Sequence, residues 1–313
     1  MKTFFALVAA ACASMVSAHG VIQDFTANGK SYKGPGPVEE TMPALPDSPI
    51  RQVYSNGPVK DLKSGDMACG IGSVNVTTQG VAEVSAGSEI SFQFGDWPHP
   101  EGPVTTYLGK CPGSADTCDG TTLKWFKISE GGYDPASNTW YQGNVLVAGK
   151  PVTTTIPAGL ENGVYLARLE IVALHLAATE GGAEFYISCT QIKVVDGGSA
   201  APSGDMLVSF PGAYKPTDPG FLVDIYTNFH SYSYPGPPMF TGGDSSPAPQ
   251  DPPTQDPTET GGSSGEETAT ATPTPTPQDP SSDPTQPPSQ PTKPPSSCSR
   301  QSRRRSRHRR RAY

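Results

Sequence analysis

The sequence predicts an all-β fold, an antiparallel β-sandwich of the immunoglobulin or fibronectin III type with long loops. Three segments alternate apolar and polar residues with the period of two that is typical of strands, at 81–94, 163–174 and 183–195. Prolines and glycines separate these segments, and no long stretch carries apolar residues at helical spacing. Many short strands joined by turn-rich connections favour two packed sheets whose loops carry the function.

The composition divides the chain into four parts. Residues 1–18 have one lysine, an apolar run and a Val-Ser-Ala ending, which predicts a secretory signal peptide. Residues 19–240 contain all three tryptophans and most apolar residues, enough for one domain with a substantial core. Residues 241–297 are rich in Pro, Ser, Thr, Gln and Asp without an aromatic residue, so we expect a disordered linker or tail. Residues 298–313 form a basic tail with eight arginines.

The predicted domain is acidic, with twelve Lys and Arg against twenty-two Asp and Glu over residues 19–240. This excess argues against nucleic-acid binding by the domain. The signal peptide predicts a secreted, extracellular protein, and Asn75 begins a glycosylation acceptor pattern consistent with secretion. No apolar run after residue 18 is long enough to cross a bilayer, so we expect no membrane partner. Attachment to anionic wall polymers and proteolytic loss are the two alternatives for the basic tail.

Four cysteines fall within the predicted domain, Cys69, Cys111, Cys118 and Cys189. An even number in a secreted domain indicates two disulfides. Cys111 and Cys118 bracket a short polar loop, so we expect a local bridge between them, which leaves Cys69 with Cys189. Three pairings are formally possible.

The histidines and one tyrosine indicate a metal site. Cleavage after Ala18 would make His19 the amino terminus, where one residue offers two nitrogen ligands, its α-amino group and its ring. His99 follows a predicted strand in a proline-rich loop, His175 ends a second strand pattern, and Tyr186 lies in the next. An amine, imidazoles and a weak phenol suit Cu(II), with zinc as the competing metal. The alternative is that these side chains are ordinary hydrogen-bonded core residues.

Seven segments, together with the predicted His19-Gly20 start, resemble the fungal lytic polysaccharide monooxygenases of auxiliary activity family 9, formerly glycoside hydrolase family 61. They follow one another across the whole predicted domain and together form a specific pattern. The segments are NGPVKDLKSGDMACG at 56–70, GPVTTYLGKC at 102–111, LKWFKISEGGYDP at 123–135, YLARLEIVALHLA at 165–177, GGAEFYISCTQIKV at 181–194, FPGAYKPTDPGFLVDIY at 210–226 and YPGPPMF at 234–240.

The resemblance implies a role for each residue of the metal site. His19, through its amine and its ring, and His99 correspond to the copper ligands of one Cu(II) per domain, and Tyr186 to the buried axial phenol. His175 corresponds to the histidine that hydrogen-bonds oxygen species beside the metal. Glu184 stands where the family carries a glutamine. An amide donates hydrogen bonds at every pH, whereas an ionised carboxylate can only accept them, which makes the donor at this position dependent on pH.

The resemblance also implies a flat substrate surface around the copper, on which sugar rings stack against exposed aromatic side chains. Tyr214 corresponds to a family position on that surface. Tyr232 is a second candidate, with structural packing as its alternative role.

These expectations define a secreted, monomeric, copper-dependent monooxygenase acting on β-1,4-glucan, with cellulose as the expected substrate. It would oxidise carbon 1 or carbon 4 at the glycosidic bond, using O2 or H2O2 and an external electron donor. The substitution at Glu184 leaves open an alternative, a copper-binding or wall-associated protein with little or no monooxygenase activity. A hydrolase is disfavoured because the matching motifs converge on histidines rather than on a carboxylate pair.

Overall fold

The computed structural model describes residues 20–73, 78 and 80–242. The chain divides into two compact units, residues 1–250 and 251–313, and every described residue belongs to the first. The predicted signal peptide, the basic tail and the linker beyond residue 242 lie outside the described residues, as do His19 and Asn75. None of the described helices has the length and apolar character needed to span a membrane.

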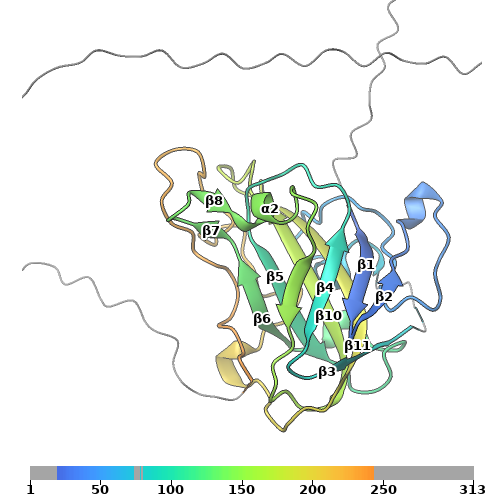
Figure 1. Cartoon of the computed structure of the whole chain (residues 1–313). Helices are drawn as coiled ribbons and strands as arrows, with labels where there is room; N and C mark the ends of the chain where they lie inside the picture. The colour runs from blue at the N-terminus through green and yellow to red at the C-terminus, as the bar shows by residue number, and fades with distance from the viewer. Residues whose placement is uncertain (1–19, 74–77, 79, 243–313) are drawn as a thin grey trace, which may run out of the picture. The chain divides into compact units, whose positions relative to one another are not determined.

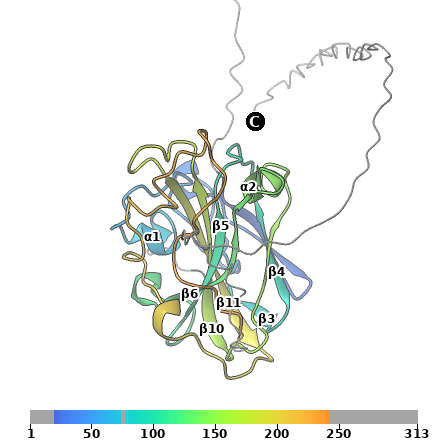
Figure 2. The ribbon, with the colours of Figure 1, turned by 90° about the vertical axis from the view of Figure 1, so that its left-hand side faces the viewer.

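Two β-sheets pack face to face in the described unit, which confirms the predicted β-sandwich (Figures 1 and 2). The smaller sheet has the strand order β2-β1-β4-β9 and the larger one the order β3-β11-β10-β5-β6. All neighbouring strands pair antiparallel except β11 and β3, which are parallel. The strands of the smaller sheet are β1 (Ile22–Ala27), β2 (Lys30–Lys33), β4 (Glu89–Phe94) and β9 (Val152–Thr155). Those of the larger sheet are β3 (Ala82–Ser85), β5 (Val104–Lys110), β6 (Trp125–Gly131), β10 (Gly163–Ala173) and β11 (Glu184–Val195).

The remaining elements are short and lie in the connections. Strands β7 and β8 form a two-stranded ribbon, and two α-helices and three 3-10 turns complete the described unit. Their bounds are β7 (Tyr133–Asp134), β8 (Thr139–Trp140), α1 (Asp66–Cys69), α2 (Tyr141–Asn144), η1 (Val38–Glu40), η3 (Gly120–Thr122) and η4 (Gly204–Met206).

The predicted strand segment 81–94 forms two strands, β3 and β4, that belong to different sheets. Gly87 lies between them with a φ of +80°, a left-handed conformation that glycine adopts without a steric penalty. The segments 163–174 and 183–195 form β10 and β11, which pair along their whole length from Gly163 opposite Val194 to Ala173 opposite Glu184.

Strand β10 is buried on both faces because a separate apolar cluster covers each face of the larger sheet. Its alternate residues Tyr165, Ala167, Leu169, Ile171 and Ala173 face the cluster between the two sheets, while Leu166 and Val172 face a second cluster beneath the loops. The loops are therefore packed onto the sheet as a second core.

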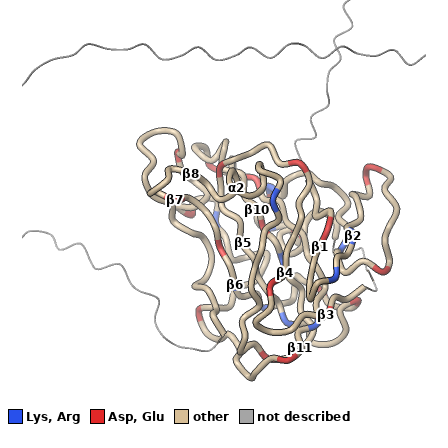
Figure 3. The backbone as a smooth tube through the Cα atoms, viewed as in Figure 1, with Lys and Arg blue, Asp and Glu red and all other residues tan. Residues whose placement is uncertain are grey.

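Both predicted disulfides are present, which settles the pairing among the three possibilities. Cys69 of α1 is bonded to Cys189 of β11, with Cα atoms 5.1 Å apart, and fastens the loop-side core to the larger sheet. Cys111 is bonded to Cys118 and closes the short loop after β5. Acidic residues are spread along the described chain, mostly outside the strands, and outnumber Lys and Arg (Figure 3).

Candidate metal centre

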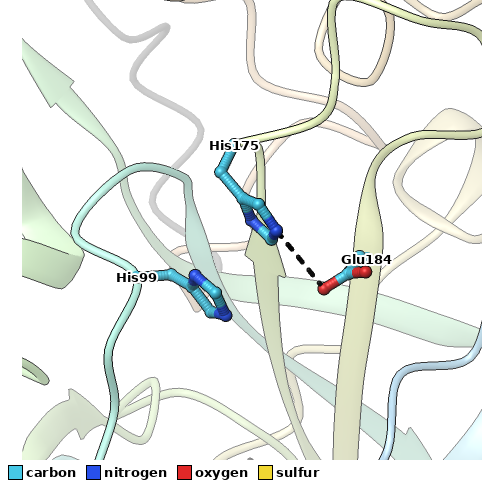
Figure 4. A group of neighbouring side chains, drawn as sticks. All are labelled: His99, His175 and Glu184. Carbon is cyan, nitrogen blue, oxygen red and sulfur yellow. Dashed lines mark ion pairs between the residues drawn. The ribbon is translucent and has the colours of Figure 1, made fainter. Parts of the chain in front are cut away.

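Three ionisable side chains meet at one end of the sandwich (Figure 4). His99 lies in the connection between β4 and β5, His175 is the second residue after β10, and Glu184 is the first residue of β11. One ligand atom from each of the three lies within 4.8 Å of the others. The rings of His99 and His175 stack with centroids 4.2 Å apart and planes within 1° of parallel. Sequence segments about 80 residues apart thus lie side by side at this end of the sandwich.

Trp97 anchors the loop that carries His99. Its indole ring packs edge-to-face against His99, at a centroid distance of 5.3 Å, and against Tyr186 at 4.8 Å. The indole nitrogen donates a hydrogen bond of 2.9 Å to the side-chain oxygen of Gln142, which is fully buried and donates in turn to two backbone carbonyl groups. Neither Trp97 nor Gln142 is identified from the sequence, although a tryptophan two residues before a histidine in a proline-rich loop is a usable signal.

Tyr186 packs against Trp97 and is 3% exposed. Its hydroxyl donates a hydrogen bond of 2.9 Å to Oε2 of Glu184. Burial, and then the hydrogen bond to Glu184 and the charge of that carboxylate, raise the pKa of the Tyr186 phenol well above its ordinary value. The phenol is therefore protonated at neutral pH.

Glu184 is held by two partners. Its Oε1 lies 2.8 Å from Nζ of Lys60, and its Oε2 accepts from Tyr186 and lies 3.9 Å from Nε2 of His175. Burial alone would raise the pKa of Glu184, but the hydrogen bonds from Lys60 and Tyr186 and the charge of Lys60 outweigh burial and leave the pKa below its ordinary value. Glu184 is therefore an acceptor at neutral pH, and its donor form is confined to acidic pH.

His175 has one buried ring nitrogen, Nδ1, without a hydrogen-bond partner among the described residues. Buried polar atoms are nearly always paired, so this nitrogen is a candidate to bind a ligand or a hydrogen-bond partner. Two imidazoles beside a protonated phenol form a donor set of the kind that copper accepts. The carboxylate of Glu184 is the weaker ligand candidate because Lys60 and Tyr186 already occupy its oxygens. His19 lies outside the described residues, so its part in the site stays a prediction.

The predicted substrate-stacking role of Tyr214 is wrong because the structure buries this side chain. Tyr214 is 7% exposed, and its hydroxyl donates a hydrogen bond of 2.7 Å to Oε1 of Glu170. A second hydrogen bond of 2.7 Å joins it to the hydroxyl of Tyr107. Its ring packs within the loop-side core and leaves no face for a sugar.

Tyr232 fits its alternative role in packing. Its hydroxyl donates to the backbone carbonyl of Gly220 at 3.0 Å, and its ring packs edge-to-face against Trp140 and Tyr234 at centroid distances of 5.1 and 5.3 Å. These contacts use both its polar and its apolar parts.

An exposed tyrosine that the sequence analysis missed lies beside the site. Tyr226 is 64% exposed, and its hydroxyl donates a weak hydrogen bond of 3.3 Å to the backbone carbonyl of His175. Asp224 accepts the backbone N–H of Tyr226 at 2.9 Å and so fixes the turn that presents this ring. Leu176, which follows His175, is 51% exposed. Tyr226 ends the mostly apolar segment FLVDIY, in which Asp224 is the one residue that favours a turn.

Comparisons with known proteins identify the family of this chain. The family model of Auxiliary Activity family 9 (formerly GH61) matches residues 19–234. AA9 family lytic polysaccharide monooxygenase B of Gloeophyllum trabeum is 44% identical over 251 residues, which cover 77% of this chain and 98% of that protein. Lytic polysaccharide monooxygenase D of the same fungus is 42% identical over 252 residues, covering 77% of this chain and 70% of that protein.

Solved structures share the fold over the described unit. Cel61B from Hypocrea jecorina, a glycoside hydrolase family 61 member, superposes with a TM-score of 0.64 at 32% identity, covering 71% of this chain and all of that one. A cellulose-active polysaccharide monooxygenase from M. thermophila superposes with a TM-score of 0.63 at 30% identity, covering 71% of this chain and 99% of that one.

Proposed function

Because this chain belongs to Auxiliary Activity family 9, the lytic polysaccharide monooxygenases, we propose that it is a secreted enzyme that cleaves cellulose oxidatively. Cleavage would take place at carbon 1 or carbon 4 of the β-1,4 linkage, with O2 or H2O2 as oxidant and an external electron donor. The observation that carries the proposal is the meeting of His99, His175 and Tyr186 at one end of the sandwich, next to the exposed ring of Tyr226. The choice of cellulose is supported by the similar protein from M. thermophila, which is described as cellulose-active.

One copper ion would be held by His19, through its amine and its ring, by His99 and by Tyr186. When bound, copper supplies the one-electron chemistry that neither imidazole nor phenol can perform alone. Trp97 holds the His99 loop against Tyr186, and this rigid support keeps the ligand rings in place without the metal. His175 directs its Nε2 toward the same space and can hold a proton or a hydrogen bond there.

The substrate would lie across an exposed surface, because a crystalline polysaccharide does not enter a deep pocket. Tyr226 takes the stacking role in this proposal, since its ring is the most exposed large apolar side chain of the described residues and contacts the His175 loop. Leu176 extends the apolar surface beside it. Stacking on Tyr226 would orient the glucan chain next to the histidines.

Calorimetric titration with Cu(II) tests the proposed ligand set. The protein that begins at His19 should bind copper tightly, and one extra residue before His19 should weaken binding severely because an amide nitrogen is no neutral donor. His99→Ala should weaken Cu(II) binding by more than the roughly 10–100-fold that follows loss of an outer-shell partner of a metal site. Equal affinities of the mature and the extended protein would contradict the proposed ligand set.

A further inference from the structure

Lys60 is brought to Glu184 by backbone pairing. Val59 and Phe185 form an antiparallel bridge, in which the N–H of Val59 donates to the carbonyl of Phe185 at 2.8 Å and the N–H of Phe185 donates back at 3.4 Å. In an antiparallel pair, the residue after one member faces the residue before the other. Lys60 and Glu184 are therefore cross-strand neighbours, and their ion pair of 2.8 Å follows from the fold.

The carboxylate of Glu184 is divided between two roles. Oε1 forms the ion pair with Lys60, while Oε2 accepts a hydrogen bond from Tyr186 and lies on the side of His175. The side chain of Glu184 is 13% exposed and that of Lys60 is 47% exposed. Lys60 is the only lysine or arginine that forms an ion pair with Glu184 among the described residues. Without it, a largely buried negative charge would be uncompensated beside the ligand candidates, which is costly in a protein interior.

We propose that Lys60 is a positioning residue of the metal centre that holds Glu184 by Oε1 and neutralises it. The Lys60–Glu184 pair carries no net charge, and both carboxylate oxygens accept hydrogen bonds, Oε1 from Lys60 and Oε2 from Tyr186. Lys60 thereby keeps the carboxylate from joining the ligand set and leaves Oε2 to orient the hydroxyl of Tyr186. This inference rests on the proposed copper site.

A surface ion pair with no role at the metal is the competing explanation, since exposed pairs contribute little to stability. The two differ in what happens at the metal when Lys60 loses its charge. A freed carboxylate is attracted to Cu(II), whereas an ordinary surface pair leaves the metal unchanged when it is broken.

The experiment is a double-mutant cycle in the protein that begins at His19, with Lys60→Met, Glu184→Gln and the double variant. Lys60→Arg is the conservative rescue, and Lys63→Met removes a charge from the same loop at an exposed site without a described ion pair. Each protein is measured by Cu(II) titration, by electron paramagnetic resonance of the bound Cu(II), and by thermal unfolding without metal.

We expect Lys60→Met to alter the Cu(II) spectrum and to tighten Cu(II) binding by about tenfold, within the range of coupling between neighbouring residues. The double variant should regain the wild-type spectrum, and Lys60→Arg and Lys63→Met should keep it. Without metal, Lys60→Met should lower the unfolding midpoint by about 2–4 °C when Glu184 is present and by less when it is Gln.

Two results would overturn the inference while leaving the proposed function intact. One is a Lys60→Met spectrum that superimposes on that of the wild type, and the other is an equal effect of Lys60→Met in both Glu184 backgrounds. If the wild-type protein fails to bind Cu(II) at all, the proposed function is refuted, and the inference falls with it.

Discussion

Replacement of Tyr226 by alanine tests how the protein would contact a polysaccharide. A tyrosine side chain presents about 150–250 Å², and this residue is 64% exposed. If one ring face lies against a sugar ring, roughly 60 Å² is covered, which at about 25 cal/mol per Å² gives about 1.5 kcal/mol. That free energy corresponds to roughly a tenfold weaker Kd for cellulose in Tyr226→Ala.

Binding isotherms on microcrystalline cellulose measure this loss, and Tyr226→Phe is the matched control because it keeps the ring and removes only the hydroxyl. We expect the phenylalanine variant to bind within about twofold of the wild type, because its ring supplies the same apolar area. An alanine variant that is fully folded and binds cellulose as tightly as the wild type would refute the stacking role. A phenylalanine variant as weak as the alanine variant would show that the hydroxyl, and not the ring, carries the contact.

Three further expectations concern stability and pH. Tyr214→Phe removes the hydroxyl that donates to buried Glu170, so the free energy of unfolding should fall by about 1–3 kcal/mol. The affinity for cellulose should not change. An unchanged unfolding midpoint would contradict a structural role for this hydrogen bond. The pKa of Asp224 is lowered, first because its carboxylate accepts the N–H of Tyr226. The ionised carboxylate therefore stabilises the turn fully above the unfolded pKa of about 3.9, and this stabilisation is lost as pH falls through the folded pKa. The amide proton of Tyr226 should titrate by NMR below pH 3.9, with no such step in Asp224→Asn, and a midpoint at or above that value would contradict the hydrogen bond. A chain that ends at residue 243 should unfold at the same temperature as the full chain, because Phe240 is buried as the last core residue described, and a lower midpoint would move the domain boundary.

The strands and both disulfides could be predicted because they depend on local pattern and on a small number of cysteines. A period of two marks β10 and β11, and the seven-residue separation of Cys111 and Cys118 favours a local bridge. His99 and His175 are singled out by the family resemblance together with their places after strand patterns, and the structure brings their rings together; that they serve a metal stays a prediction.

The substrate surface could not be predicted in the same way. Tyr214 and Tyr226 lie in irregular connections without periodicity, so nothing in the sequence indicates which one is buried. The burial of Tyr214 depends on Glu170, which lies 44 residues away and needs a donor for its carboxylate. The exposure of Tyr226 depends on a turn made by a single aspartate side chain.

The residues that support the candidate metal centre could not be predicted either, because their roles depend on contacts between distant segments. Lys60 meets Glu184 only through a bridge between residues that are 126 positions apart in the chain, Val59 and Phe185. Trp97 supports His99 through Gln142, which is 45 residues further on. A sequence pattern records which residues are present but not which of these distant segments pair.

Incubation of the copper-loaded protein that begins at His19 with cellulose, with and without a reductant, tests the central claim most directly. Mass spectrometry should detect oligosaccharides oxidised at carbon 1 or carbon 4 only when the reductant is present, and both removal of copper and His99→Ala should abolish them. Unoxidised oligosaccharides released without reductant would indicate hydrolysis and contradict the account. A protein that binds copper and cellulose yet releases no oxidised products would contradict it as well, and would favour a copper-binding protein without monooxygenase activity.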